Sequence, residues 1–133
     1  MKHLMALSTL VIALAVLAVK AEAKTTTLRG YVVDKACAGK MAQKANAMEK
    51  AEGHTKDCAL NDQCAASGFG IFSGGKFTPF DEKGSARAKE LIEKSKREKG
   101  LYFEARGTVT GGTMDVTSLR EITPKSTMMK KGM

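Results

Sequence analysis

Residues 101–116, LYFEARGTVTGGTMDV, contain the clearest secondary-structure pattern in the sequence. Apolar and polar side chains alternate over residues 101–110, which is the two-residue period of a strand with one buried face. The Gly-Gly pair that follows is typical of a two-residue hairpin loop. The alternation resumes after the loop and then slips, which predicts a β-bulge near Thr117 or Ser118. We therefore expect the domain to end in a long antiparallel hairpin.

Three further strands are predicted upstream of this hairpin. Residues 28–33 are rich in strand-forming side chains. Residues 68–73 and 76–80 flank a second Gly-Gly pair and predict another hairpin. Pro79 is expected at a sheet edge or a strand end, because its nitrogen cannot donate to a ladder.

Two segments favour helices. Residues 38–66 are rich in Ala, Lys, Met and Gln and poor in β-branched residues, and we expect Gly53 to divide them into two short helices. After a turn over residues 81–84, Ser85 is the expected N-cap of a helix of about three turns. Gly100 is expected to end this helix.

The predicted order of elements is strand, helical insertion, two strands, helix and two strands, which is the order found in OB-folds. We therefore predict a mainly β domain with helices (α+β). It would be a five-stranded OB-fold-like barrel with a helical Cys/His insertion between strands 1 and 2 and a helix between strands 3 and 4. Closure of the barrel would remove the exposed strand edges that a small sheet must otherwise protect.

The length and composition restrict the architecture further. The chain has 133 residues, of which 43% are hydrophobic and 27% charged, and it contains no Trp. These numbers suit one small domain. The sequence has no strict glycine period, long heptad run or Pro/Ser-rich tract, so collagen-like, coiled-coil and low-complexity architectures are excluded.

The first 23 residues predict a secretory signal peptide. Lys2 and His3 precede an apolar run over residues 4–19, and Ala21 and Ala23 fit an A-x-A cleavage site. The apolar run is shorter than the roughly 20 residues that a membrane-spanning helix needs. We therefore expect cleavage, no stable membrane span in the mature protein, and a periplasmic or extracellular location.

Cleavage would leave an OB-like domain over residues 24–123 and a tail over residues 124–133 that is expected to be disordered. The whole chain has a formal net charge of +8. For an exported protein, this charge favours an envelope or extracellular ligand such as an anionic lipid, a polysaccharide or an acidic protein over nucleic acid. The few aromatic residues also disfavour a base-stacking surface. The charge identifies no single partner.

The candidate chemistry lies in four residues of the insertion: Cys37, His54, Cys58 and Cys64. On a continuous helix, His54 and Cys58 would share one face. Cys64 would point elsewhere unless the helix breaks, and Asn61-Asp62 is a suitable place for a break. With Cys37 at the end of the first strand, a tetrahedral Cys3His metal site becomes geometrically feasible.

Several interpretations of these residues remain open. Four protein ligands would form a closed structural site, with Zn(II) the default metal and Cu(I) the soft-ligand alternative. Alternatively, one disulfide forms and leaves a free thiol, as is usual for exported cysteines, and the barrel surface is then an envelope or extracellular binding module. An intermolecular disulfide or a redox role is a third interpretation.

Catalytic motifs are absent from the sequence. It has no C-x-x-C, C-x-x-C-H, G-x-S-x-G, H-E-x-x-H or phosphate-loop pattern. Its carboxylates are scattered, and no pair of them can be assigned to one pocket. We therefore expect a protein that is not an enzyme.

The sequence resembles a family of small, mostly uncharacterised bacterial secreted proteins. The resemblance covers residues 28–122 and lies in three places: Gly30-Tyr-Val-Val-Asp34 leading to Cys37, His54-x3-Cys58-Ala59 with Cys64, and the hairpin over residues 107–116. The family's pattern is an early Cys followed by a short cluster of one His and two Cys. The resemblance implies an OB-type barrel with a Cys/His-bearing insertion, and it implies no established enzymatic activity.

Overall fold

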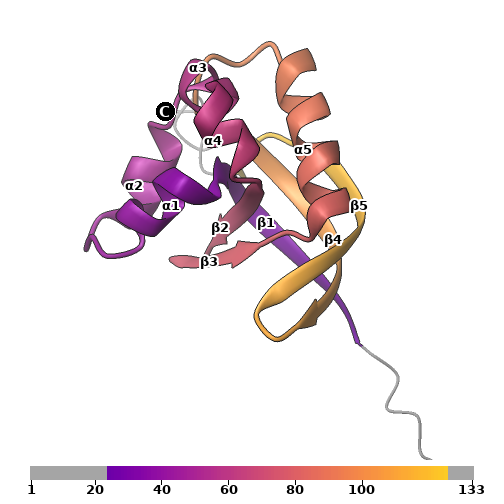
Figure 1. The fold of residues 1–133 in the computed structure, drawn as a ribbon. Coiled ribbons are helices and arrows are strands. Elements are labelled where there is room, and N and C mark those ends of the chain that lie inside the picture. Colours follow the sequence, from indigo (N-terminus) through magenta and orange to yellow (C-terminus); the bar gives the residue numbers. More distant parts are fainter. Residues whose placement is uncertain (1–23, 126–133) are drawn as a thin grey trace, which may run out of the picture.

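The structure is a computed structural model that describes residues 24–125 (Figure 1). The predicted signal peptide and residues 126–133 of the predicted tail lie outside these described residues. None of the helices within residues 24–125 is long and apolar enough to cross a membrane.

Five strands form one antiparallel sheet in the order β3-β2-β1-β4-β5. The strands are β1 (Thr25–Asp34), β2 (Phe69–Ser73), β3 (Lys76–Pro79), β4 (Tyr102–Thr110) and β5 (Thr113–Glu121). Four short helices connect β1 to β2: α1 (Lys35–Met41), α2 (Ala47–Glu52), α3 (Lys56–Leu60) and α4 (Asp62–Ala66). A longer helix, α5 (Glu82–Lys94), connects β3 to β4. Both helical connections therefore lie between the strands that the sequence predicts.

The sheet is open, and the predicted closed barrel is not found. β3 and β5 are the edges of the sheet. Within residues 24–125, they approach each other at one isolated parallel bridge between Phe80 and Met114, where the amide of Asp81 donates to the Met114 carbonyl at 2.9 Å. β3 has only 4 residues, and it ends at Pro79, which has no N–H to extend the contact. The edge position of Pro79 is confirmed.

The hairpin of β4 and β5 is confirmed. Both glycines of its loop have positive φ, 59° and 82°, as a two-residue turn between twisted strands requires. Arg106 pairs with Ser118 and Gly107 pairs with Val116, so Thr117 is the additional residue of a β-bulge. The predicted position of the bulge is therefore also confirmed.

The helices divide unequally between the two faces of the sheet. On one face, α3, α4 and α5 cover a core that includes Phe69, Ile71, Phe103 and Ile92. On the other face, α1 and α2 cover a smaller cluster around Val33 and Phe72. This second cluster lies over β1 and β2 and leaves the β4 and β5 side of that face without a helix (Figure 1).

Three predicted helix boundaries are wrong. α5 begins earlier than predicted because Asp81 is its N-cap, and the carboxylate accepts a hydrogen bond from the Gly84 amide at 2.9 Å. The helix ends at Lys94, with Ser95 rather than Gly100 as the C-cap. In the insertion, Gly53 does end a helix, but caps at Thr55 and Asn61 start two more, so the segment forms four helices instead of two.

Candidate metal centre

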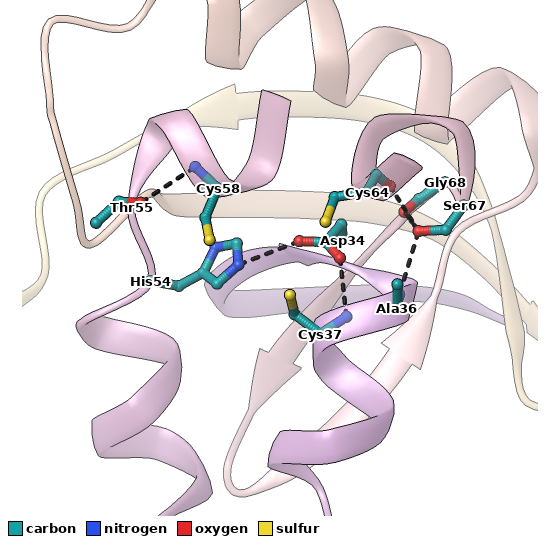
Figure 2. Close-up of polar contacts among 9 residues, drawn as sticks. All are labelled: Asp34, Ala36, Cys37, His54, Thr55, Cys58, Cys64, Ser67 and Gly68. Atoms are coloured by element: carbon teal, nitrogen blue, oxygen red, sulfur yellow. Dashed lines mark hydrogen bonds and ion pairs between the residues drawn. The ribbon is translucent and has the colours of Figure 1, made fainter. Parts of the chain in front are cut away.

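Three side chains of the insertion bring potential metal ligands together: Asp34, Cys37 and Cys64. A carboxylate oxygen of Asp34 and the two sulfur atoms all lie within 4.8 Å of one another. Asp34 is fully buried, and both cysteines are half-buried. Figure 2 shows the two thiols on either side of the Asp34 carboxylate and His54 approaching it from a third direction.

The pairing of β1 with β2 explains why residues so far apart in the sequence meet here. Asp34, the last residue of β1, is the register partner of Phe69, the first residue of β2. Cys37 lies in the first turn of α1, directly after β1, and Cys64 lies in α4, which ends just before β2. The antiparallel pair therefore brings the start of α1 next to the end of α4.

Local hydrogen bonds hold this junction together. The Lys35 amide donates to the Gly68 carbonyl at 2.9 Å. The Ser67 hydroxyl accepts from the Ala36 amide at 3.1 Å and donates to the Cys64 carbonyl at 2.6 Å. These contacts connect the backbones next to Cys37 and Cys64, and those through Ser67 are drawn in Figure 2. They hold the start of α1 beside the end of α4.

His54 is not one of the three close ligand residues, but it contacts one of them, Asp34. It lies between α2 and α3, is 6% exposed, and its Nε2 lies 3.1 Å from Asp34 Oδ1. This distance is that of an ion pair, but the contact lacks the alignment of a hydrogen bond. His54 therefore faces the carboxylate without forming a complete hydrogen bond to it.

Cys58 is not part of the group of close ligand atoms. Its side chain is exposed, in the first turn of α3. His54 and Cys58 would share a face on a continuous helix, but Thr55 caps a new helix between them by accepting a hydrogen bond from the Cys58 amide at 3.1 Å. The predicted break at Asn61 is present, since this residue ends α3 and caps α4.

Asp34 is the site residue that the sequence did not assign. Its Oδ2 accepts a hydrogen bond from the Cys37 amide at 2.8 Å, which makes Asp34 the N-cap of α1. An Asp between a strand and a helix is an ordinary cap in sequence terms. The available signal in the sequence was an Asp at the end of a predicted strand, three residues before a Cys. Whether that Asp is buried depends on the tertiary structure.

The electrostatics of the group oppose a thiolate in the absence of a cation. Burial raises the pKa of Cys37, and the nearby Asp34 carboxylate and the Cys64 thiol raise it further, to about 12. Burial also acts to raise the pKa of Asp34, but the His54 ring and the Cys37 amide outweigh burial and lower it. At neutral pH, the metal-free group thus holds an ionised carboxylate beside a protonated Cys37 thiol.

Three buried atoms at this site have no hydrogen-bond partner among the described residues: Asp34 Oδ1 and both ring nitrogens of His54. Buried polar atoms are nearly always paired with protein, water or an ion. In tetrahedral zinc sites, bond lengths of about 2.0–2.3 Å place the ligand atoms about 3.3–3.8 Å apart. The 3.1 Å contact between His54 Nε2 and Asp34 Oδ1 is close to that spacing. The ligand atoms of Asp34, Cys37 and Cys64, which lie within 4.8 Å of one another, would need to approach by no more than about 1.5 Å.

Comparisons with protein-family models, curated proteins and solved structures found no match to this chain. The resemblance to a family of bacterial secreted proteins therefore remains a prediction.

Proposed function

We propose that this protein is an exported, non-enzymatic OB-type domain whose helical insertion is stabilised by one metal ion bound to Asp34, Cys37, Cys64 and His54. The observation that carries the proposal is that the buried Asp34 Oδ1 and the His54 ring nitrogens lack hydrogen-bond partners and lie beside two thiols. A cation at this position would pair with Asp34 Oδ1 and a ring nitrogen of His54. It would also favour deprotonation of the thiols, which a buried carboxylate alone opposes.

The construction of the insertion supports a structural role for the metal. Its four helices have only 5 to 7 residues each. Isolated helices shorter than about 12 residues are marginal in water. α1 fully buries only Ala38, and α4 fully buries no residue. The four proposed ligands come from β1, α1, α4 and the link between α2 and α3, so one ion would connect these pieces.

The ligand types favour Zn(II). Two thiolates, an imidazole and a carboxylate are all common zinc ligands, and four protein ligands leave no open position for a substrate. Cu(I) prefers an all-sulfur or sulfur and imidazole environment. The carboxylate of Asp34 therefore disfavours Cu(I), and we keep it as the second choice.

Export is the other part of the proposal, and it rests on the N-terminal 23 residues, whose basic start, apolar run and Ala-x-Ala end are typical of a signal peptide. Outside the cytosol, oxidation of cysteines competes with their binding to a metal. The metal would protect Cys37 and Cys64 from oxidation, because a thiolate bound to the metal is not free to attack another sulfur atom.

Native mass spectrometry of the mature protein, loaded with zinc and freed of excess metal, tests the proposal. We expect one zinc ion per chain and three alkylatable thiols once the protein is denatured without reductant. Cys37→Ser and Cys64→Ser should each lose the ion. Cys58→Ser is the matched control, since it removes an exposed thiol outside the group, and it should keep the ion. If Cys58→Ser loses zinc as readily as the other two variants, the proposed ligand set is wrong.

A second candidate function follows from the proximity of Cys37 and Cys64. Their sulfur atoms lie within 4.8 Å of each other, so oxidation could join them and leave Cys58 as a free thiol. The protein would then be a disulfide-stabilised binding module without a metal. The same experiment identifies this outcome by a denatured mass lower by two hydrogens, one alkylatable thiol and no bound zinc.

A further inference from the structure

A charged and aromatic surface lies on the part of the sheet that α1 and α2 leave uncovered. Two rows of cross-strand neighbours form it. Arg29 of β1, Glu104 of β4 and Arg120 of β5 are register partners in one row. In the next row, Tyr31 of β1 pairs with Tyr102 of β4. Both rows project from the face that also carries the cluster under α1 and α2.

The charged row has an excess of positive charge. Glu104 is 3% exposed, and it accepts hydrogen bonds from Arg29 at 2.8 Å and from Arg120 at 3.1 Å. The guanidinium of Arg106 lies 3.5 Å from the same carboxylate. One buried carboxylate thus neutralises only one of three arginines. The arginine side chains stay 53–65% exposed, and each guanidinium has five N–H donors, so donors remain for another anion.

The aromatic row forms the wall of a hollow next to these arginines. The Tyr31 and Tyr102 rings pack edge to face, with centroids 5.0 Å apart. The hollow has a volume of about 630 Å³, which lies within the range of about 300–1,000 Å³ typical of small-molecule sites. Its lining combines these tyrosines with Arg29, Glu104 and Arg120 and with the apolar side chains of Met48 and Ile122.

We infer that this hollow binds a small organic oxyanion, a carboxylate or phosphate joined to a compact apolar body. Arg29 and Arg120 would bind the oxyanion, because guanidinium groups pair with carboxylate and phosphate through two parallel hydrogen bonds. The apolar body would lie against Tyr102, Met48 and Ile122. Glu104 has the positioning role, since its two oxygens hold the guanidiniums on either side of it. The hollow is separate from the metal centre, so this inference stands without the proposed metal.

The protein carries its own reporter for this site. It has two tyrosines and no tryptophan, and both tyrosines line the hollow. Intrinsic tyrosine fluorescence therefore reports on this hollow. Cyclohexanecarboxylate and cyclohexyl phosphate serve as the two oxyanion probes because they absorb little ultraviolet light. Cyclohexylmethanol is the neutral counterpart, inorganic phosphate is the charge without the apolar body, and sodium chloride controls for ionic strength.

We expect saturable fluorescence changes with at least one of the two oxyanion probes, and the stronger one identifies the headgroup. Cyclohexylmethanol and inorganic phosphate should bind at least about tenfold more weakly, since each lacks one half of the recognition. Arg29→Gln and Arg120→Gln should each weaken binding of the preferred probe about tenfold. Arg106→Gln is the matched control, because Arg106 contacts the same carboxylate but does not line the hollow, and it should change binding less than threefold.

Several results would overturn the inference. It fails if neither oxyanion gives a saturable change, or if the neutral alcohol binds as tightly as the anions. It also fails if Arg106→Gln weakens binding as much as Arg29→Gln, because the loss of binding would then come from the lower positive charge of the surface and not from a direct contact with the probe. Thermal unfolding of each variant without the probe verifies that the fold is retained. If Arg29→Gln fails to fold, Arg120→Gln and Arg29→Lys, which keeps the charge but not the planar guanidinium, provide the same comparison.

Discussion

Asp34 has a different partner on each carboxylate oxygen. Oδ2 accepts from the Cys37 amide and starts α1, whereas Oδ1 faces the ring of His54. One buried side chain therefore both defines a helix boundary and orients the candidate metal centre. Because the two roles use different atoms, substitutions at this position can separate them.

Asp34→Asn and Asp34→Ala should both weaken zinc binding at least tenfold, because each removes the anionic ligand. Without metal, the two variants should differ. Asn is an effective N-cap and Ala is not, so the Ala variant should have a free energy of unfolding lower by about 1 kcal/mol than the Asn variant. Urea unfolding with a chelator present measures the stability difference, and competition with a chromogenic chelator measures zinc affinity. Wild-type zinc affinity in Asp34→Asn would contradict the role of the carboxylate as a ligand.

At the scale of single elements, tertiary contacts decide the boundaries that local preference leaves open. Gly84 suggests a turn in the sequence, yet it lies inside α5 and is buried. A Cβ at this position would approach Val116 Cγ2 to 2.6 Å. The glycine therefore allows α5 to pack closely on β5. The local sequence pattern does not show this contact, so it could not predict that Gly84 lies inside a helix.

Gly84→Ala should destabilise the protein by about 1–3 kcal/mol, because the added methyl group overpacks the interface with β5. Gly39→Ala in α1 is the matched control. A Cβ there meets no atom within 4 Å, so the usual helix preference for Ala should stabilise the protein by about 0.5–1 kcal/mol. Chemical denaturation of both variants measures these opposite signs. Stabilisation by Gly84→Ala would show that α5 can move away from β5 at little cost.

The candidate site was only partly predictable, for reasons that belong to particular elements. The sequence identifies Cys37, His54 and Cys64 by residue type, and the break at Asn61 that turns Cys64 towards them. It misses Asp34, because the sequence alone does not distinguish an Asp that caps a helix from one that is buried and can bind a metal. It also assigns Cys58 as the third thiolate, and the structure places this residue on the exposed side of a new helix that the Thr55 cap starts after His54.

At the scale of the whole molecule, the five strands and their order along the chain were predictable, but closure of the sheet was not. Alternation and the two Gly-Gly loops identify all five strands and the bulge at Thr117. Closure depends on how far β3 extends along β5, and β3 is too short to add a ladder to the bridge between Phe80 and Met114. The placement of the helices also leaves β4 and β5 without a covering helix on one face. On that face, the buried carboxylate of Glu104 contacts three arginine side chains.

This buried carboxylate should make the stability of the whole molecule depend on pH in the acid range. Hydrogen bonding from Arg120 lowers the pKa of Glu104; burial opposes this effect, and a second hydrogen bond from Arg29 adds to it. As the pH falls, the unfolded chain therefore takes up this proton before the folded chain does. The stabilisation by Glu104 should be fully present above its ordinary pKa of 4.5 and should be lost as the pH falls below that value.

Glu104→Gln should accordingly be less stable than the wild type at pH 7 and should lose less stability than the wild type between pH 5 and pH 3. Its amide cannot take up the proton, and it also leaves three guanidiniums without their central carboxylate. Glu90→Gln is the control on α5. Glu90 also pairs with an arginine and a lysine, but its side chain is 46% exposed, and exposed pairs contribute little. Urea unfolding across this pH range, with chelator present to remove any metal contribution, gives the free energy of unfolding at each pH. If the wild type and Glu104→Gln lose stability in parallel, the acid sensitivity arises elsewhere in the molecule.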